Sequence, residues 1–233
     1  MNRPWKALWL GAGLMLLAVG FLSVGCGSGS TQFRFVNAFT GPNAGSMDIL
    51  VDTVSTFTNV ATNTATAYAG ISGGSHQITI EPSGTTSPIF NPPPAISFPS
   101  GNNTTLIGDT NSSFVNTFVT FTDQNTAPVV NDYSLRVICL AFTPFKNVDI
   151  YIYPYPSSPP LNITNLSPTL TNLTFNGASS YLTKTIGNYD IVVSQTGTKA
   201  EIIDTGQVSF GSQQVRTFVV LNNSNYLILS DLN

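Results

Sequence analysis

The sequence is poor in the residue types on which most recognisable chemistry depends. Only 8% of its 233 residues are charged, and it contains one histidine and two cysteines. Lys and Arg are too few and too scattered to offset nucleic-acid phosphates, so nucleic acid is excluded as a partner. A zinc site lacks ligands, and a Ser-His-Asp triad would depend entirely on His76. We therefore expect no enzyme, no cofactor and no metal site.

The small charged fraction contrasts with ample apolar and aromatic content. Hydrophobic residues make up 42% of the chain and aromatic residues 11%, which is enough for a core and argues against disorder. Once Arg3 and Lys6 of the N-terminal segment are set aside, six basic residues remain against eleven acidic ones, a net charge of −5. Uncharged Ser, Thr and Asn are abundant. This composition favours an extracytoplasmic, β-rich protein.

The N-terminal segment has the layout of a secretory signal. A basic start precedes an uncharged run from Ala7 to Cys26, and a small residue stands directly before the cysteine. The junction resembles the lipobox of bacterial lipoproteins, in which the cysteine is acylated and becomes the new N-terminus, although Ser23 stands where leucine is usual. This resemblance implies a signal peptide at 1–25, a lipid on Cys26 and a short Gly/Ser tether at 26–31.

Two other interpretations of the segment stay open. The uncharged run is almost long enough to span a bilayer, so it could be an uncleaved anchor, and ordinary signal cleavage is the third possibility. In the lipoprotein interpretation, membrane lipid is a partner through Cys26, and the protein lies in the bacterial cell envelope, at the outer membrane or cell surface. Cys139, in the apolar stretch LRVICLAF, is expected to be a small core residue.

The mature chain contains two copies of one sequence unit. Tyr68–Thr85 aligns without a gap with Tyr181–Thr198, and FRFVNAF…SMDILV lies over LRVICLAF…NVDIYI. Downstream, ISFPSGNNTTLIG matches VSFGSQQVRTFVV, and FVTFTDQN matches YLILSDLN. Self-similarity at a spacing of about a hundred residues indicates a tandem duplication. We predict a first repeat at 32–128 and a second at 133–233.

Each copy is built from short strand-like stretches. Apolar and polar residues alternate over four to eight positions between Gly, Pro and Asn, and no helical period occurs outside the signal. We predict an all-β protein with two tandem antiparallel immunoglobulin-like β-sandwich domains. One continuous sandwich or barrel shared by both halves is the alternative. The second copy also carries an insertion, YPYPSSPPLNIT, whose prolines exclude a central strand.

The recurring elements resemble a known family. Arg34 and Arg136 open the two copies, and each is followed by an Asp-apolar strand, a Tyr and a Gly-x-[Tyr/His]-x-Ile strand that ends near Gly-Thr. This order is similar to the domain of unknown function DUF4397, which is common in secreted and surface bacterial proteins and often occurs in tandem. That family often carries a histidine three residues after the arginine, where this chain has Asn37 and Cys139. The resemblance implies no activity.

A repeated pair of charged residues is the first candidate site. Arg34 and Asp48 lie fourteen positions apart, and Arg136 and Asp149 lie thirteen apart. We expect each pair to form a structural bridge between strands, because a guanidinium pairs well with a carboxylate. Repeated ion-binding sites are the alternative. A calcium site at Asp48 and Asp52 would need more oxygen ligands than the surrounding sequence offers.

A stripe of tyrosines is the second candidate. Tyr151, Tyr153 and Tyr155 alternate along one strand-like stretch, so the three rings could share one face and stack on sugar rings. A covered aromatic patch is the other interpretation, with the adjacent proline-rich insertion as the cover. His76 aligns with Tyr189 in the other copy, which favours packing over proton transfer.

These observations lead to one expected function and two alternatives. We expect a membrane-anchored cell-envelope lipoprotein with a structural or binding role, whose partner would be an envelope polysaccharide or protein. A carbohydrate-binding, adhesin-like module is the first alternative, and a hydrolase is the second.

Overall fold

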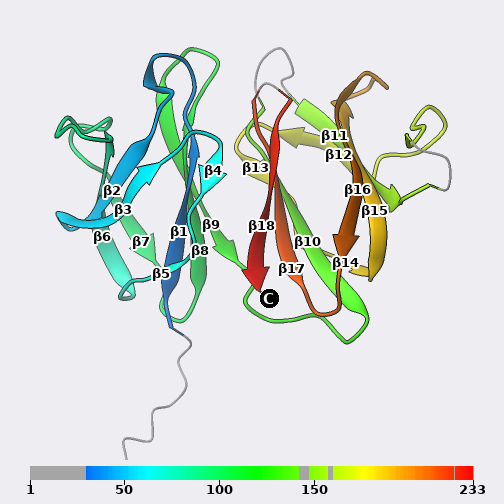
Figure 1. The fold of residues 1–233 in the computed structure, drawn as a ribbon, viewed down its shortest axis with the longest axis horizontal. Coiled ribbons are helices and arrows are strands. Elements are labelled where there is room, and N and C mark those ends of the chain that lie inside the picture. The colour runs from blue at the N-terminus through cyan, green and yellow to red at the C-terminus, as the bar shows by residue number, and fades with distance from the viewer. Residues whose placement is uncertain (1–29, 142–146, 157–159, 223, 233) are drawn as a thin grey trace, which may run out of the picture.

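The chain folds almost entirely into β-strands. The computed structural model describes residues 30–141, 147–156, 160–222 and 224–232 (Figure 1). The predicted signal peptide, Cys26 and most of the tether therefore lie outside the described residues. Within the described ranges, no helix is long and apolar enough to cross a membrane.

We call residues 32–123 the first half and residues 132–232 the second half. The first half contains β1 (Gln32–Ala38), the 3-10 helix η1 (Gly41–Asn43), β2 (Met47–Val51), β3 (Val54–Val60), β4 (Thr64–Ala65), β5 (Ala69–Gly70), β6 (Gly74–Pro82), β7 (Ala95–Phe98), β8 (Asn103–Thr110) and β9 (Asn116–Asp123). The second half contains β10 (Asp132–Cys139), β11 (Asn147–Pro154), β12 (Leu170–Thr174), β13 (Gly177–Ala178), β14 (Leu182–Thr185), β15 (Gly187–Gln195), β16 (Glu201–Phe210), β17 (Val215–Val220) and β18 (Tyr226–Leu232).

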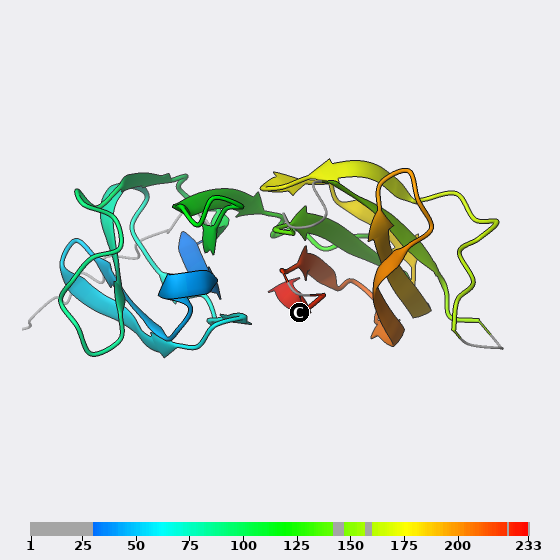
Figure 2. The same cartoon turned by 90° about the horizontal axis from the view of Figure 1, so that it is seen from above.

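The two halves have the same strand order. In the first half the sheets run β4-β1-β8-β9 and β3-β2-β6-β7, and in the second half they run β13-β10-β17-β18 and β12-β11-β15-β16. The short strands β5 and β14 join β1 and β10 in the same way. Figure 2 shows the halves side by side, each with two layers of strands. The prediction of an all-β, sandwich-like fold is confirmed.

One feature of the sheets departs from the predicted antiparallel pattern. β1 pairs in parallel with β8, and β10 pairs in parallel with β17, while the other pairs are antiparallel. These four strands lie in the middle of their sheets and are buried along nearly their whole length. Strands covered on both faces carry near-continuous apolar runs instead of a clean alternation.

Each half has its own apolar core between its two sheets. In the first half, Phe33, Phe35 and Leu106 pack against Ile49 and Ile78 of the opposite sheet. In the second half, the matching core gathers side chains from β10, β11, β15, β16 and β17, including the predicted core residue Cys139. Burial raises the pKa of the Cys139 thiol to about 11, so this thiol is protonated and unreactive at neutral pH.

A third apolar cluster joins the halves. The outer faces of β1 and β8 contribute Val36, Ala38 and Ile107, and they pack with Leu140 and Leu221 from the second half. The sheets β4-β1-β8-β9 and β13-β10-β17-β18 therefore face each other across the middle of the molecule, as Figure 1 shows. The candidate site lies at the edge of this apolar contact.

Candidate functional site

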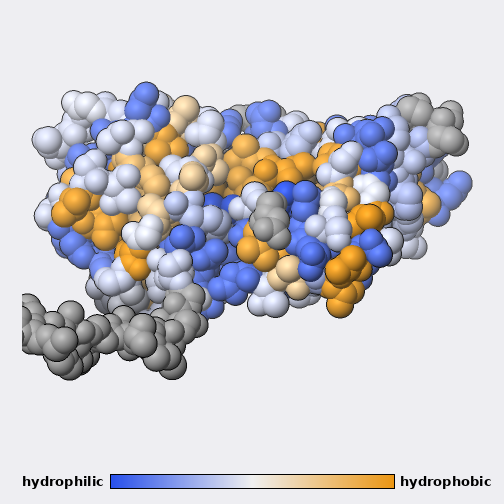
Figure 3. All heavy atoms as spheres, turned by 60° about the horizontal axis from the view of Figure 1, so that its bottom comes forward, coloured by the Kyte–Doolittle hydropathy of each residue, from blue (hydrophilic) through white to orange (hydrophobic). Residues whose placement is uncertain are grey.

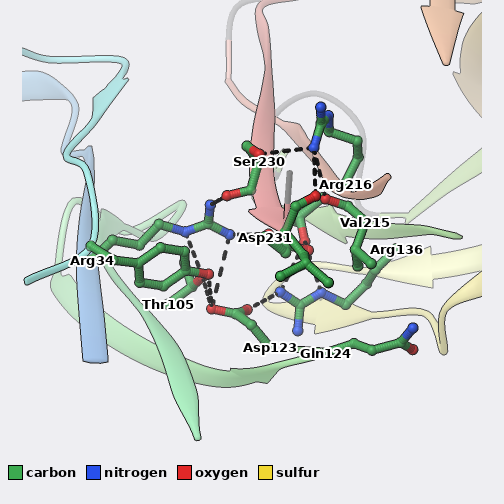
Figure 4. Close-up of polar contacts among 12 residues, drawn as sticks. Arg34, Thr105, Asp123, Gln124, Arg136, Val215, Arg216, Ser230 and Asp231 are labelled. Carbon is green, nitrogen blue, oxygen red and sulfur yellow. Dashed lines mark hydrogen bonds and ion pairs between the residues drawn. The ribbon is translucent and has the colours of Figure 1, made fainter. Parts of the chain in front are cut away.

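The repeated arginines form ion pairs across the contact between the halves. Arg34 on β1 pairs with Asp231 on β18, and Arg136 on β10 pairs with Asp123 on β9 (Figure 4). The side chains of both aspartates are fully buried, and those of both arginines are 3–4% exposed. The predicted bridges within each copy are therefore wrong, because the partner of each arginine comes from the last strand of the other half.

Arg34 is held by hydrogen bonds from its guanidinium and by one aromatic ring. Its Nε donates to Thr105 Oγ1 at 2.8 Å, its Nη1 donates to the Ser230 carbonyl oxygen at 3.0 Å, and its Nη2 donates to Asp231 Oδ1. The Tyr68 ring lies under the guanidinium, with Cζ 4.7 Å from the ring centroid. Charge-assisted hydrogen bonds of this kind are among the stronger polar contacts in proteins.

Arg136 repeats this arrangement in the opposite direction. Its Nε donates to Thr217 Oγ1 at 3.2 Å, its Nη1 donates to the Thr122 carbonyl oxygen at 3.0 Å, and its Nη2 donates to Asp123 Oδ1. The Tyr181 ring lies 4.9 Å from the guanidinium Cζ. The two halves thus exchange equivalent contacts, as the two subunits of a twofold-symmetric dimer do.

Each aspartate is also held by donors from its own half. Asp123 Oδ2 accepts hydrogen bonds from the Tyr68 hydroxyl at 2.6 Å and from Thr105 Oγ1 at 2.7 Å. Asp231 Oδ2 accepts equivalent bonds from Tyr181 and from the threonine of β17, at 2.7 and 2.6 Å. Burial raises the pKa of both tyrosines, so the hydroxyls stay neutral donors. The network therefore binds protein to protein, and its arginines are engaged rather than open to an anion.

Asp48 and Asp149, the predicted partners of the arginines, have a different shared role. Asp48 Oδ1 accepts the backbone N–H of Asn59 at 2.7 Å, and its Oδ2 accepts the N–H of Gly84 at 3.3 Å. Asp149 accepts equivalent bonds from Asn172 and Gly197, at 2.8 and 3.1 Å. Both asparagines have a positive φ, 54° and 56°. The repeated aspartates thus stabilise irregular backbone, and the Asn59 hydrogen bond is the main cause of the lowered pKa of Asp48.

The tyrosine stripe is covered. Tyr151 is only 1% exposed and packs with Leu161, Ile163 and Val192, while Ile150 and Ile152 fill the core on the other face, as the alternation predicts. We call residues 160–169 the covering segment.

Hydrogen bonds to the covering segment and to Lys199, which also donates to the Leu166 carbonyl oxygen of that segment, hold the tyrosines as well. The Tyr153 hydroxyl donates to the Ser167 carbonyl oxygen at 2.7 Å, and Lys199 Nζ donates to the Tyr151 hydroxyl at 2.9 Å. Tyr155 is half-buried. The predicted ligand platform of Tyr151, Tyr153 and Tyr155 is therefore wrong, because the Tyr151 face is occupied by the protein's own chain.

His76 lies between a serine and an aspartate, an arrangement that no sequence motif indicates. Its Nδ1 is 2.6 Å from Asp52 Oδ2, and its Nε2 is 3.1 Å from Ser72 Oγ. The same Nε2 is also 3.0 Å from the Ser72 carbonyl oxygen, an atom that can only accept a hydrogen bond. The Asp52 carboxylate and the Ser72 carbonyl oxygen both accept hydrogen bonds, so each contact requires a proton on the ring nitrogen that makes it. When Nε2 carries its proton, it cannot take the proton of the serine hydroxyl. In the other half, Tyr189, which aligns with His76, donates its hydroxyl proton to the Thr185 carbonyl oxygen at 2.7 Å.

Two further carboxyl groups are buried without a basic partner. Asp109 on β8 is fully buried; its Oδ1 accepts the Thr110 N–H at 2.7 Å, and its Oδ2 has no hydrogen-bond partner. Burial raises the pKa of Asp109 to about 7. Asp190 on β15 is also fully buried; the Leu161 N–H and the Thr205 hydroxyl are the donors beside its carboxylate, and neither contact has good hydrogen-bond geometry. Burial and the neighbouring carboxylate of Asp204 raise the pKa of Asp190 to about 6.

Comparison with known proteins identifies the family. The model of DUF4397, a domain of unknown function, matches residues 28–151, more than half of the 233 residues. The chain belongs to the DUF4397 family. The matched DUF4397 region ends in β11, so it contains Arg34, Asp123 and Arg136 but not Asp231. No curated protein matches the chain.

Solved structures give only a distant likeness to this DUF4397 protein. A structure described as alpha-glucan binding by a streptococcal virulence factor has a TM-score of 0.29 at 8% identity, over 86% of this chain and 96% of the other. A product complex of a multi-modular glycogen-degrading pneumococcal virulence factor has a TM-score of 0.29 at 8% identity, over 88% of this chain and 22% of the other. A leucine-rich repeat protein from Bacteroides thetaiotaomicron has a TM-score of 0.23 at 12% identity, over 82% of this chain and 26% of the other. This likeness is too low to carry a functional argument.

Proposed function

We propose that the protein is a lipid-anchored cell-envelope protein, in which two tandem DUF4397 domains form one structural or binding body. The matching strand order of the two halves supports the tandem arrangement. The matching positions of Arg34 and Arg136, and of Asp123 and Asp231, support it further.

The reciprocal ion pairs between the halves are the observation that carries this proposal. The arginines, the tyrosines and the aspartates Asp123 and Asp231, which recur in both halves, are bound to one another within this buried network. Removing one partner of a buried ion pair costs about 3–5 kcal/mol, because the other charge stays buried without compensation, so each buried charge depends on a partner from the opposite half. A body of fixed shape suits a spacer or a scaffold that displays a binding surface. No enzymatic step is needed to account for the residues that recur in both halves.

The anchor is proposed from the sequence, and the fold supports its placement. Cys26 precedes the start of β1 by six residues, which span roughly 20 Å when extended. β1 begins at the end of the molecule that the linker between β9 and β10 also crosses (Figure 1). Val129 and Val130 of this linker are 71% and 66% exposed. This end would face the bilayer in an anchored protein.

The face of the molecule that includes this end has a mixed surface. On the face drawn in Figure 3, apolar side chains form several separate patches among hydrophilic residues. Gly27 and Ser28 lack the aspartate that retains lipoproteins at the inner membrane in some bacteria, so the outer membrane or cell surface is the proposed location.

Metabolic labelling with a radioactive fatty acid tests the anchor. The wild-type chain should incorporate label and fractionate with membranes, and Cys26→Ala should do neither. Cys139→Ala is the matched control, because this buried thiol should carry no lipid and its loss should leave labelling unchanged. Equal labelling of wild type and Cys26→Ala would overturn the proposed anchor.

A further inference from the structure

The end of the molecule at which the chain enters its fold is built from connections of both halves. β1 and β8 begin there side by side, as do β10 and β17 in the second half, and β9 and β18 end there. The ion pair of Arg34, near the start of β1, with Asp231, near the end of β18, places the two halves at the same level (Figure 1). We call this end the tether end. Its connections are 71–73, 99–102, 124–131, 186 and 211–214.

The connections of the tether end carry no charge. None of their residues is Asp, Glu, Lys, Arg or His. Hydrogen bonds tie them to the start of β1: the Gly101 N–H donates to Thr31 Oγ1 at 2.8 Å, and the Ile71 N–H donates to the Thr31 carbonyl oxygen at 3.0 Å. Charged side chains are costly at the apolar edge of a bilayer, and these connections would bring none there.

The linker between β9 and β10 places exposed apolar side chains at the tether end. The strongly exposed Val129 and Val130 are the first two residues of a turn, in which the Asp132 N–H donates to the Val129 carbonyl oxygen at 3.1 Å and Asn131 has a φ of 71°. Ile186 is also exposed, and its N–H donates to the Asn131 carbonyl oxygen at 2.9 Å. We call Val129, Val130 and Ile186 the apolar tip.

The second half fixes this turn in its exposed position. The Asn131 N–H donates to Ser212 Oγ at 2.9 Å, and the Gln213 N–H donates to the Asp132 carbonyl oxygen at 2.7 Å. No residue of the apolar tip belongs to an apolar cluster of the described residues. The linker occurs only once, between the copies, so the repeat does not account for its valines. Neighbouring apolar side chains that the backbone holds in solvent indicate a contact outside the chain.

The length of chain before β1 indicates what this contact is. Cys26 precedes Gln32 by six residues, so a lipid on Cys26 keeps the tether end within about 20 Å of the bilayer. We propose that the apolar tip inserts into the headgroup region of that bilayer, with the lipid surface as its partner. This inference rests on the proposed anchor at Cys26. Interfacial binding increases with the apolar area buried, and a short tether raises the effective concentration of the tip at the surface, so a small apolar area suffices.

The contact orients the body on the membrane. Both halves contribute connections to the tether end, so the long axis of the molecule, horizontal in Figure 1, lies along the bilayer. The connection between β8 and β9, which contains Val115, then points away from the lipid, separated from it by the eight residues of β8, or roughly 25 Å. The mature chain has a net charge of −5, so anionic lipids do not attract it, and the contact is apolar and insensitive to salt.

Quenching of a tryptophan by brominated lipid tests the contact. Trp5 and Trp9 lie in the predicted signal peptide, so the mature chain, 26–233, with Val130→Trp has a single tryptophan. Coupling the Cys26 thiol to a maleimide lipid in phosphatidylcholine vesicles supplies the anchor without acylation in a cell, and the buried Cys139 does not compete. Interfacial side chains lie about 5–10 Å deep, so dibrominated phosphatidylcholine should quench Val130→Trp roughly twofold, at low and at high salt.

Substitutions at Val115 are the matched controls. This valine is also exposed, at the other end of β8 and β9, so Val115→Trp should not be quenched. Val129→Asp, combined with Val130→Trp, should abolish the quenching, because a carboxylate keeps the tip out of the lipid. Val115→Asp, combined with Val130→Trp, should leave the quenching unchanged. These positions are exposed, so the substitutions do not threaten the fold.

The outcomes separate the apolar tip from the anchor. Absence of quenching in Val130→Trp, equal quenching in Val115→Trp, or quenching that persists with Val129→Asp would overturn the proposed contact, whatever fatty-acid labelling shows at Cys26. A blue-shifted Val130→Trp emission without quenching by bromine would mean that the tip contacts another copy of the chain, and would also overturn it. The expected quenching, together with no fatty-acid labelling in cells, would overturn the anchor and leave the affinity of the tip for lipid established.

Discussion

Arg34 on the first strand of the fold forms its ion pair with Asp231 on the last strand, 197 positions away in the sequence. The equivalent Arg136 pairs with Asp123, only 13 positions away. The two equivalent ion pairs therefore join residues at very different sequence separations, because each arginine contacts an aspartate of the opposite half. The arrangement connects the two halves through buried charge in addition to apolar contact.

The first prediction concerns the coupling of Arg34 with Asp231. A double-mutant cycle with Arg34→Met and Asp231→Asn, followed by urea unfolding, should give a coupling energy well above that of a surface pair. Each single substitution should cost about 3–5 kcal/mol, because each leaves a buried group without its partner, and the double substitution should cost less than their sum.

The cycle of Arg34 with Asp48 is the control. Asp48 accepts hydrogen bonds from Asn59 and Gly84, so Asp48→Asn should weaken that turn independently of the arginine. The effects of Arg34→Met and Asp48→Asn should therefore add within about 0.5 kcal/mol. Strong coupling in this cycle, with additive effects in the other, would restore the bridge within one copy.

The second prediction concerns the pH dependence of stability at Asp109. Its folded-state pKa, about 7, lies above the ordinary 3.8, so the folded state holds the proton where the unfolded state has lost it. The contribution to stability is therefore complete below about pH 4 and is lost as the pH rises through 7. Asp109→Asn should remove this decline and should be more stable than the wild type at pH 8, by on the order of 2–4 kcal/mol.

Asp109→Leu extends the same test. Asp109 lies on the same strand face as Ile107, which packs between the halves, and it aligns with Leu221, which belongs to that apolar cluster. Leucine at this position should therefore stabilise the protein at pH 8 at least as well as asparagine. The difference between wild type and variant, measured by urea unfolding from pH 4 to pH 8, isolates Asp109 from the other carboxyl groups. A parallel decline in both proteins would contradict the prediction.

The sequence predicted local structure well and pairing poorly. Strand alternation correctly placed Ile150 and Ile152 in the core, because the two faces of a strand differ in burial. The alignment FVTFTDQN with YLILSDLN already contained Asp123 and Asp231. The repeat spacing favours Asp48 and Asp149 as partners, although Asp123 lies as close to Arg136 in the sequence as Asp149 does, at 13 positions. Contacts between distant strands depend on how the sheets face each other, and sequence spacing does not encode this.

The proline-rich insertion shows the same limit. Its prolines correctly excluded a central strand, but they did not reveal which surface the insertion would cover. Leu161 and Ile163 within it were the available signal, since both are apolar and need a surface to pack on. The cluster of Ser72, His76 and Asp52 carried no sequence motif, because its geometry depends on the turn between β2 and β3.

The third prediction concerns Tyr151 as a packing residue. Tyr151→Ala should cost about 3–5 kcal/mol in urea unfolding, because it leaves a cavity between the sheet and the covering segment. Tyr151→Phe keeps the ring and removes the hydroxyl that accepts a hydrogen bond from Lys199, so it should cost about 0.5–1.5 kcal/mol. Titration with envelope polysaccharides should not distinguish Tyr151→Phe from the wild type. A small effect of Tyr151→Ala on stability, with a loss of glycan binding, would revive the ligand platform.

The fourth prediction is that the Ser72–His76–Asp52 cluster is structural and not catalytic. Tyr189 makes the equivalent contact with a backbone carbonyl in the other half, so His76→Tyr should fold normally, with a Tm within roughly 3 °C of the wild type. The His76 hydrogen bond is the main cause of the lowered pKa of Asp52, so NMR titration should show this pKa returning towards its ordinary value in the variant. A fluorophosphonate probe, which modifies activated serines, should label the wild type no more than Ser72→Ala, because the contact of His76 Nε2 with the Ser72 carbonyl oxygen requires a proton on Nε2, and a protonated Nε2 is no base for the hydroxyl. Labelling that depends on both Ser72 and His76 would reverse this conclusion and make the cluster a nucleophilic site.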